Sequence, residues 1–346
     1  MKLTFEQIIS AANGIIRTEQ NELGLELHRF SRDKEGFFYK THPYYCKDSF
    51  FNGYFGRNCR TSAGVTLDFI SDAKAIRITF GATEYAKTKK DRVHLFDLYI
   101  DGEFAQSFKT EEMIDFISTG EEKRFTLYFP YYAFPIISSV TLEDATVFLP
   151  QKKQIDILFL GDSITHGAIA VKPSNTYVMR VARNLDVGVL NQGNSGFVYD
   201  AGSIEKVCEP KIIVTAYGIN DYMRKGLQEL KDDTVKFLYE LRNTYPNAKI
   251  VSILPLWTVW NASQPNFKGD KREALQKIYE EYSDFVINGH ALIPHDPKYL
   301  ADEVHPNDEG FKFYGNIFAR ICLDIRHCST PFVISLPFLQ YITKLR

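Results

Sequence analysis

The segment Gly161-Asp162-Ser163 places a serine where a nucleophile could work. An apolar run precedes it and a helical pattern follows, so the hydroxyl is expected at the rim of a sheet and the serine N–H at a helix N-terminus. A backbone N–H at such a position can stabilise the oxyanion that forms when the hydroxyl attacks a carbonyl carbon. A helix-capping serine without a catalytic role has the same local sequence, so this segment alone leaves both interpretations open.

An aspartate and a histidine lie three residues apart in Asp302-Glu303-Val304-His305-Pro306. With this spacing the Asp302 carboxylate can bond one ring nitrogen of His305, which leaves the other nitrogen to face a serine. In a catalytic triad an acid orients a base in this way, and the base activates a nucleophile. Pro306 restricts His305 to extended backbone angles and so helps to fix its direction. The alternative is a surface histidine beside solvated acids.

Two glycine-containing segments could supply hydrogen-bond donors to an oxyanion. Gly193 lies in segment 191–196, after an apolar run, and a loop N–H there could point inward. Asn220 lies in segment 218–221, whose sequence is G-I-N-D, and its carboxamide is a neutral donor with no proton to lose. Taken alone, each segment is an ordinary turn.

Other serines and histidines are weaker catalytic candidates. Ser195 follows a glycine-containing turn, but no helix begins behind it. His295 and Asp296 are adjacent rather than three residues apart, and we interpret them as part of a loop. His166 is close to Ser163 in sequence and could line a pocket, although a histidine on a helix surface is the more common case.

The only two tryptophans, Trp257 and Trp260, follow an apolar run directly. That position predicts a place near the rim of the site, where an aromatic face can stack on a sugar ring. Packing in the core or between domains is the alternative. Asp162 is expected to accept loop N–H bonds. Together with His166 and the two tryptophans it completes the set of candidate substrate-binding residues.

Residues from about 25 to 150 have the pattern of short strands separated by turns. The predicted strands, each rich in β-branched or aromatic residues, are 65–69, 75–80, 94–100, 125–129 and 137–141. Asp101-Gly102 predicts a hairpin turn. This regular spacing favours an antiparallel β-sandwich, which we assign to residues 1–150 together with a short helix capped by Thr4 and Gln7.

After about residue 151, apolar runs alternate with helical patterns. The predicted strands are 155–160, 187–190, 212–216 and 250–254, and the predicted helices are 176–185, 227–244, 271–285 and 309–325. Such alternation indicates an α/β fold with a parallel sheet covered on both faces. Ligands of such sheets bind beyond the carboxyl ends of the strands, where Ser163, Gly193 and Asn220 are predicted. We assign residues 151–330 to this domain and expect the tail, 331–346, to pack on the body.

Composition excludes several functional classes. The chain has 346 residues, which predicts two domains, and its 45% hydrophobic and 24% charged residues exclude disordered, collagen-like and coiled-coil proteins. A net charge of −2 provides no basic excess for nucleic acid or an anionic membrane. Five cysteines without a C-x-x-C pair indicate neither a zinc site nor a disulfide framework. The common dinucleotide, phosphate-loop, zinc-protease and nucleophile-elbow motifs are missing.

Neither end of the sequence predicts a targeting or membrane segment. Asn13 and Gly14 interrupt the apolar stretch 8–16, and no small-x-small cleavage site follows it. The apolar stretch 331–342 contains two prolines and is far shorter than a membrane span. We therefore expect a cytoplasmic protein that partners neither nucleic acid nor a membrane, with a homodimer left open.

In combination, the four segments resemble the blocks of the SGNH (GDSL-type) hydrolase superfamily: G-D-S, a glycine after the second strand, G-x-N-D and D-x-x-H. The resemblance covers about residues 151–328 and rests on Ser163, Gly193, Asn220 and His305 in that chain order. It implies a flavodoxin-like three-layer α/β/α fold and a Ser163–His305–Asp302 triad. It also implies an oxyanion hole formed by the N–H groups of Ser163 and Gly193 and the Asn220 side chain, with no metal or cofactor.

The N-terminal half carries a second resemblance. Segment 95–99 resembles the G-x-D-L-Y signature of the jelly-roll-like sandwich domains that precede some SGNH hydrolases, with Leu95 in place of the glycine. Segments 60–65 and 127–130 also look like parts of those domains. Similar two-domain layouts occur among bacterial carbohydrate esterases that remove acetyl groups from sugars.

These resemblances imply a serine esterase that hydrolyses short-chain, chiefly acetyl, esters of saccharides, with a small-molecule or oligosaccharide ester as its partner. Two alternatives stay open at this point. One is a lipid or thioester acylhydrolase, because acyl-chain capacity cannot be deduced from one sequence. The other is a non-catalytic saccharide-binding protein.

Overall fold

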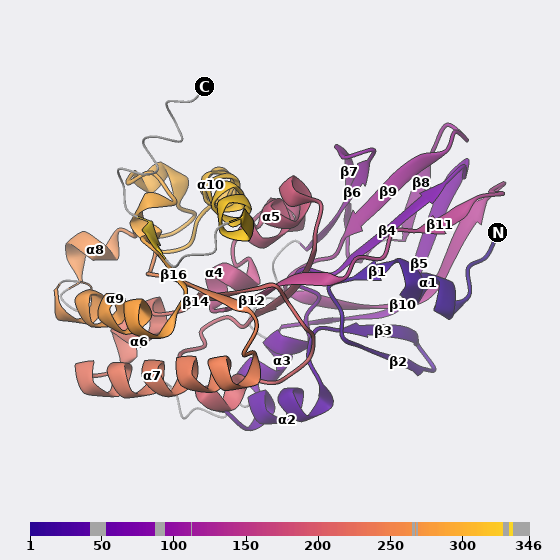
Figure 1. Ribbon diagram of the computed structural model, residues 1–346. Coiled ribbons are helices and arrows are strands. Elements are labelled where there is room, and N and C mark those ends of the chain that lie inside the picture. The colour runs from indigo at the N-terminus through magenta and orange to yellow at the C-terminus, as the bar shows by residue number, and fades with distance from the viewer. Residues whose placement is uncertain are drawn as a thin grey trace.

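In the computed structural model, residues 1–41, 53–86, 94–111, 113–264, 267, 269–327 and 332–334 are described. Two antiparallel sheets form one side of the molecule, and a parallel sheet flanked by helices forms the other (Figure 1). The predicted fold class, an α/β domain preceded by a β-sandwich, is confirmed.

The N-terminal sandwich consists of two sheets whose strand pairs are all antiparallel. One sheet has the order β1 (Ala12–Asn13), β4 (Thr66–Ser71), β9 (Lys123–Tyr128), β6 (Leu95–Ile100), β7 (Glu103–Lys109), and β11 (Phe148–Pro150) also pairs with β4. The other has the order β2 (Arg17–Asn21), β3 (Gly24–His28), β10 (Ala133–Glu143), β5 (Ala75–Tyr85), β8 (Ile114–Ile117). The predicted β6–β7 hairpin turns at Asp101-Gly102, whose φ angles of 50° and 86° suit a tight turn.

Alternation along the strands gives the first of these sheets two different faces. On β4, Leu67 and Phe69 enter the sandwich core, whereas Thr66 and Asp68 face the helical half of the molecule. The same period of two on β6 buries its apolar side chains in the sandwich and turns Tyr99 toward the C-terminal half. The sheet face that meets the C-terminal half is therefore largely polar.

The C-terminal half is built on one parallel sheet. Its strand order is β13 (Gly188–Gly193), β12 (Ile155–Gly161), β14 (Ile212–Ala216), β15 (Lys249–Ile253), β16 (Phe285–Ile287), β17 (Phe332–Ile334). This second-first-third-fourth order is that of flavodoxin-like doubly wound sheets. The sheet places the ends of β12, β13 and β14 side by side, which brings together the segments that follow them.

Helices cover both faces of the parallel sheet. Figure 1 shows α5 (Tyr177–Leu185) and α10 (Asp308–His327) on one side and α7 (Leu227–Thr244) and α9 (Asp270–Tyr282) on the other. The shorter helices are α1 (Phe5–Ala11), α2 (Arg32–Lys40), α3 (Tyr54–Arg60), α4 (Ser163–His166), α6 (Ile219–Arg224) and α8 (Trp260–Ser263). The capping box of α1, with Thr4 and Gln7, is present as predicted.

Some predicted bounds differ from the structure. The predicted helix 271–285 ends at Tyr282, and Phe285 begins β16, a buried strand of only three residues that directly follows the helix. Of the predicted tail 331–346, β17 extends the parallel sheet beside β16, and the remainder lies outside the described residues. The elements α2, α3, β2 and β3 were not predicted.

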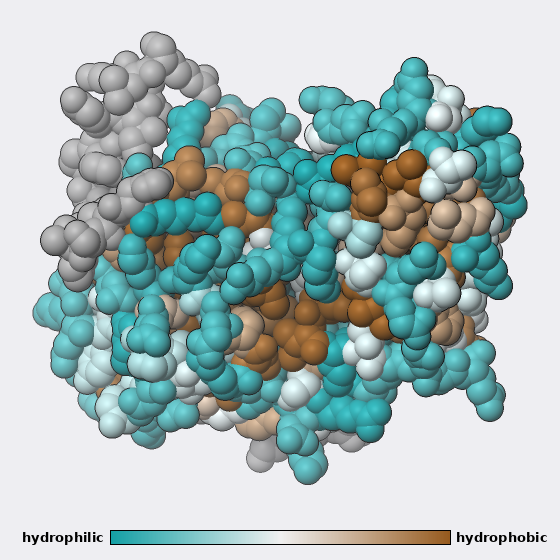
Figure 2. Space-filling model, turned by 45° about the vertical axis from the view of Figure 1, so that its right-hand side comes forward, coloured by the Kyte–Doolittle hydropathy of each residue, from teal (hydrophilic) through white to brown (hydrophobic). Residues whose placement is uncertain are grey.

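The described residues form two main hydrophobic clusters, one inside the sandwich and one around the parallel sheet. Phe30, Phe38 and Phe55 come from the N-terminal half of the chain but pack in the second cluster. Figure 2 shows one face that is mostly hydrophilic, with hydrophobic side chains gathered near its centre and on part of its right-hand half. In the described parts of the chain, no helix is long and apolar enough to span a membrane.

Candidate active site

Ser163 lies at the sharp turn between β12 and α4. Asp162 caps this four-residue helix, accepting the Ile164 N–H at 3.0 Å, and Ser163 is its first residue. Gly161 is required at the end of the strand because a Cβ there would lie 2.1 Å from the hydroxyl oxygen of Thr165. The turn leaves Ser163 partly exposed at the carboxyl end of the sheet, while its neighbours Asp162 and Ile164 are buried.

A continuous hydrogen-bond chain joins Ser163, His305 and Asp302. The Ser163 Oγ atom lies 2.8 Å from His305 Nε2, and His305 Nδ1 lies 2.8 Å from Asp302 Oδ2. The other carboxylate oxygen, Oδ1, accepts the backbone N–H groups of Val304 at 2.8 Å and His305 at 2.7 Å. The Asp302 carboxylate is thus fixed by its own loop and holds the imidazole with Nε2 toward the serine.

The Asp302 carboxylate is ionised at neutral pH. Partial burial acts to raise its pKa, but the hydrogen bonds from the His305 ring and from two backbone N–H groups outweigh burial and hold the pKa well below its usual range. The anion can therefore stabilise the imidazolium that forms when His305 takes a proton.

The structure does not support Gly193 as an oxyanion donor. Its N–H donates to the Asn191 side chain, Gly193 N to Asn191 Oδ1, at 2.9 Å, and the residue is buried as the last of β13. A Cβ at Gly193 would lie 2.4 Å from the backbone nitrogen of His166. This glycine serves the close packing of β13 on α4, and its N–H is already occupied.

Gly196 is the better-placed glycine of the same loop. It has a φ of 79°, it is partly exposed, and among the described residues no acceptor contacts its N–H. Its carbonyl accepts a hydrogen bond from Arg224 Nη1 at 2.5 Å, and the carbonyl of the next residue, Phe197, accepts the Asn220 amide at 3.2 Å. Within the described part of the chain, this turn thus has an N–H without an acceptor, and the residue after it contacts Asn220.

Asn220 lies in the first turn of α6, which begins after Gly218 with its φ of 116°. The side-chain amide also lies 3.4 Å from Asp162 Oδ2. Asn220 is therefore held between the turn that carries Ser163 and the loop that contains Gly196, which we call the glycine loop. Burial of the Asp162 carboxyl group raises its pKa to about 7. Asp162 is therefore placed as a buried support of the turn rather than as a substrate contact.

Comparisons with known proteins agree with this geometry. Residues 159–313 match the model of the GDSL-like Lipase/Acylhydrolase family. The match lies within the C-terminal half and includes Ser163, Asp302 and His305. No curated protein matches the sequence. This match and the geometry of Ser163, His305 and Asp302 support an esterase or acylhydrolase activity.

Solved structures share the fold at low sequence identity. A salicylyl-acyltransferase, SsfX3, from a tetracycline biosynthetic pathway is 17% identical with a TM-score of 0.70, over 91% of this chain and 94% of its own. A Bacteroides ovatus protein assigned as a GDSL-like lipase is 20% identical with a TM-score of 0.66, over 96% and 99%. A carbohydrate esterase family 2 enzyme with a carbohydrate-binding domain, from Corynascus thermopiles (Myceliophthora fergusii), is 16% identical with a TM-score of 0.61, over 78% and 95%.

A second serine–histidine pair, Ser195 and His166, lies next to the turn that carries Ser163. Ser195 Oγ is 2.9 Å from His166 Nδ1 and 2.8 Å from the Tyr132 hydroxyl, and His166 Nε2 is 2.7 Å from the Thr61 hydroxyl. Asp162 contributes to His166 only through its backbone carbonyl, which accepts the His166 N–H. His166 is fully buried, so it lies neither on a helix surface nor in a substrate pocket, and the pair ties the sandwich to the GDSL-like domain.

The two tryptophans contact the segment that precedes His305 in the chain, Trp257 at His295 and Trp260 at Glu303. Trp257 stacks on His295 with ring centroids 5.3 Å apart, and the Trp260 indole N–H donates to Glu303 at 2.7 Å. Both tryptophans are partly exposed, and Glu303 lies between Asp302 and His305 in the chain. The aromatic segment thus borders the loop that carries Asp302 and His305.

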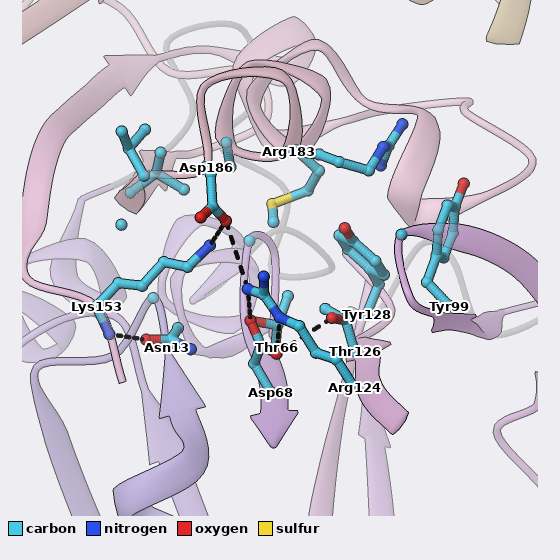
Figure 3. A pocket seen from close by; sticks show the side chains of 18 of the residues that line it. Asn13, Thr66, Asp68, Tyr99, Arg124, Thr126, Tyr128, Lys153, Arg183 and Asp186 are labelled. Carbon is cyan, nitrogen blue, oxygen red and sulfur yellow. Dashed lines mark hydrogen bonds and ion pairs between the residues drawn. The ribbon is translucent and has the colours of Figure 1, made fainter. Parts of the chain in front are cut away.

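A cavity of about 420 Å³ lies between the sandwich and α5 (Figure 3). Two ion pairs line it: Arg124 bonds Asp68 at 2.6 and 2.9 Å, and Lys153 bonds Asp186 at 2.6 Å. Arg183, which also lines it, lies over the ring of Tyr99. Ser163 does not line it. We assign this cavity to the contact between the two halves rather than to the active site.

One group of side chains in the described residues has the ligand types of a metal site: Glu19, Glu26 and His28. The two ring nitrogens of His28 bond Glu26 and Glu35, each at 2.9 Å, and Arg17 forms ion pairs with Glu19 and Glu35. Arg32 also pairs with Glu19, and Arg60 pairs with Glu26, so arginines already neutralise these carboxylates and the group is an ion-pair network of the N-terminal half.

Proposed function

We propose that the protein is a serine esterase that removes short acyl groups, acetyl above all, from saccharides through an acyl-enzyme on Ser163. The observation that carries the proposal is the hydrogen-bond chain from Ser163 through His305 to Asp302. Solved structures of the same fold include carbohydrate esterases of family 2 and an acetyl xylan esterase from Butyrivibrio proteoclasticus, which support a saccharide ester as substrate.

The first half of the reaction forms the acyl-enzyme. Ser163 Oγ attacks the ester carbonyl carbon as His305 Nε2 takes the hydroxyl proton, and the carbonyl oxygen becomes an oxyanion. The N–H groups of Ser163 and Gly196 and the Asn220 amide are the donors for that oxyanion. To donate to it, the Asn220 amide exchanges one of its bonds to Phe197 O and Asp162 Oδ2, which are 3.2 and 3.4 Å long. The bond from the carbonyl carbon to the sugar oxygen then breaks, and His305 gives its proton to the leaving alcohol.

The second half returns the free enzyme. Water attacks the acyl carbonyl carbon while His305 Nε2 takes a proton from it. The bond from that carbon to Ser163 Oγ breaks, His305 protonates Oγ, and the carboxylic acid leaves. Asp302 stays ionised throughout and stabilises the imidazolium in both halves.

Substrate class is tested with two ester series on the whole chain. Acetyl, butyryl and octanoyl p-nitrophenyl esters measure acyl-chain preference, and acetylated xylo-oligosaccharides measure acetate release from a sugar. We expect kcat/KM to fall sharply from acetyl to octanoyl, with acetate released from the oligosaccharide. A rise toward octanoyl would favour a lipid acylhydrolase. Saccharide binding without hydrolysis of any ester would favour a binding protein.

A further inference from the structure

Arg29 directly follows β3 in the sandwich, and its side chain is fully buried, with 0% exposed. The guanidinium donates to four backbone carbonyls. Two belong to the N-terminal half: Nε bonds Thr61 O at 2.6 Å and Nη2 bonds Asn58 O at 3.1 Å. The other two belong to the end of β13: Nη1 bonds the carbonyl of Asn191 and that of Gly193, the latter at 3.3 Å. One side chain therefore joins the two halves.

This arginine has no carboxylate partner among the described residues. Burial lowers its pKa to about 10, which leaves it charged at neutral pH. A buried charge without a direct ion pair is unfavourable unless other contacts compensate for lost water. Here all the hydrogen bonds of the guanidinium go to main-chain carbonyls, the Phe30 ring lies 5.1 Å away, and the charge of Glu35 favours the charged form. A well-packed apolar side chain would serve stability as well. The arrangement points instead to a need to hold these carbonyls in place.

Two of the carbonyls that Arg29 bonds belong to Asn191 and Gly193, which directly precede the glycine loop. The Asn191 side chain bonds Thr165 O at 2.8 Å, in the helix that begins with Ser163, and it also accepts the Gly193 N–H. Three residues after Gly193 comes Gly196, whose N–H has no acceptor among the described residues, and the carbonyl of the next residue, Phe197, accepts the Asn220 amide at 3.2 Å. A shift of the β13 end would therefore move the donor relative to the nucleophile.

Other residues of the N-terminal half hold the same loop. Asn194 Nδ2 donates to Phe55 O at 3.1 Å, and Tyr132 bonds the Ser195 hydroxyl. Gly64 approaches so closely that a Cβ there would lie 2.7 Å from the Asn191 Cβ. The loop is thus enclosed from the sandwich side with little freedom to adjust.

We propose that Arg29 is a positioning residue for catalysis. From the N-terminal half it fixes the end of β13, so that the N–H of Gly196 keeps its position relative to Ser163. The proposal assigns the sandwich a part in the reaction itself, and it rests on the proposed esterase function. It concerns no contact with substrate, because Arg29 is buried.

The test compares Arg29→Met and Arg29→Lys with a control at another buried contact between the two halves, Asp97→Asn. Asp97 accepts the N–H and hydroxyl of Ser174 at 3.1 and 2.6 Å, away from the glycine loop. Steady-state hydrolysis of p-nitrophenyl acetate gives kcat and KM, thermal unfolding gives stability, and hydrogen exchange by mass spectrometry reports on residues 191–197.

We expect Arg29→Met to lower kcat by about 10²-fold with KM little changed, because misplacement of about 1 Å far from the chemistry can have that effect. Exchange in 191–197 should rise, and Arg29→Lys should recover part of kcat because an ammonium can still reach some of the carbonyls. Asp97→Asn should lower the unfolding temperature with kcat unchanged.

A kcat for Arg29→Met within about twofold of wild type in folded protein would overturn the proposal. So would an equal loss of kcat in Asp97→Asn at equal loss of stability, since the effect would then be general to the contact between the halves. Wild-type protein that hydrolyses no ester would instead contradict the proposed function. In that case the exchange experiment still decides whether Arg29 holds the loop.

Discussion

The side-chain amide of Asn220 lies 3.4 Å from the Asp162 carboxylate, which also accepts the N–H of Ile164. A buried acid therefore connects the turn that carries Ser163 with the first turn of α6. The same amide bonds the carbonyl of Phe197 in the glycine loop. The segments that follow β12, β13 and β14 are thus joined by the contacts of one side chain.

Asn220→Ala should slow the reaction without abolishing it. If the amide stabilises the oxyanion, its loss raises the transition state by about 3 kcal/mol, which lowers kcat by about 10²-fold or more. The measurement is kcat for p-nitrophenyl acetate, with Asn184→Ala on the exposed side of α5 as control. An unchanged kcat in Asn220→Ala would remove the residue from the oxyanion hole.

Stability should depend on pH through Asp162. Its pKa is about 7 in the folded protein and about 3.9 in an unfolded chain, so between these values the folded state binds more protons. The free energy of unfolding should therefore fall as pH rises from about 4 to 7, and level off above. Urea unfolding at several pH values checks this. Asp162→Asn should flatten the trend, whereas Asp324→Asn on the surface of α10 should keep it.

Asp302→Asn should lower kcat by about 10²- to 10⁴-fold, because the amide cannot stabilise the imidazolium and favours the wrong tautomer. The pKa of Asp302 is held well below its usual range, so protonation of Asp302 does not account for loss of activity in mild acid. The reaction requires a neutral His305, because a protonated imidazole cannot accept the serine proton. A pH–rate profile of both proteins tests this, and a profile in which Asp302→Asn matches wild type would contradict the role.

Trp257 provides a test of the saccharide substrate. If its exposed surface contacts the sugar, Trp257→Ala should raise KM for an acetylated xylo-oligosaccharide by about tenfold and leave p-nitrophenyl acetate kinetics nearly unchanged. Tyr239→Ala, an exposed aromatic on α7, is the matched control. Equal effects on both substrates would show that Trp257 acts through its contact with His295 rather than by binding the sugar.

Local patterns predicted much of the fold. The bounds of β14 and α7 agree with the predicted ranges, because a continuous apolar run and a long helical period are strong signals. β2 was missed because its five residues are polar and it lies at a sheet edge. β16 was missed because three buried residues follow a helical pattern without a break.

The site shows the same division between local and long-range information. Asp302 and His305 are three residues apart, so their contact could be predicted from local spacing. The contact between His305 and Ser163 spans 142 residues, and it was predicted only from the resemblance of the four segments taken together. The choice between Gly193 and Gly196 depends on whether the Asn191 side chain occupies an N–H, which no spacing reveals. His166 and Arg29 have partners more than a hundred residues away, so their burial could not be deduced from their neighbours in sequence.

The central claim is that Ser163 carries the acyl group. The most direct measurement is the intact mass of the protein, quenched in acid during turnover of p-nitrophenyl acetate, followed by peptide mapping. The account predicts the added mass of one acetyl group on Ser163 in wild type, and neither adduct nor turnover in Ser163→Ala. Turnover that persists in Ser163→Ala, or an acetyl group that maps to Ser195, would contradict it.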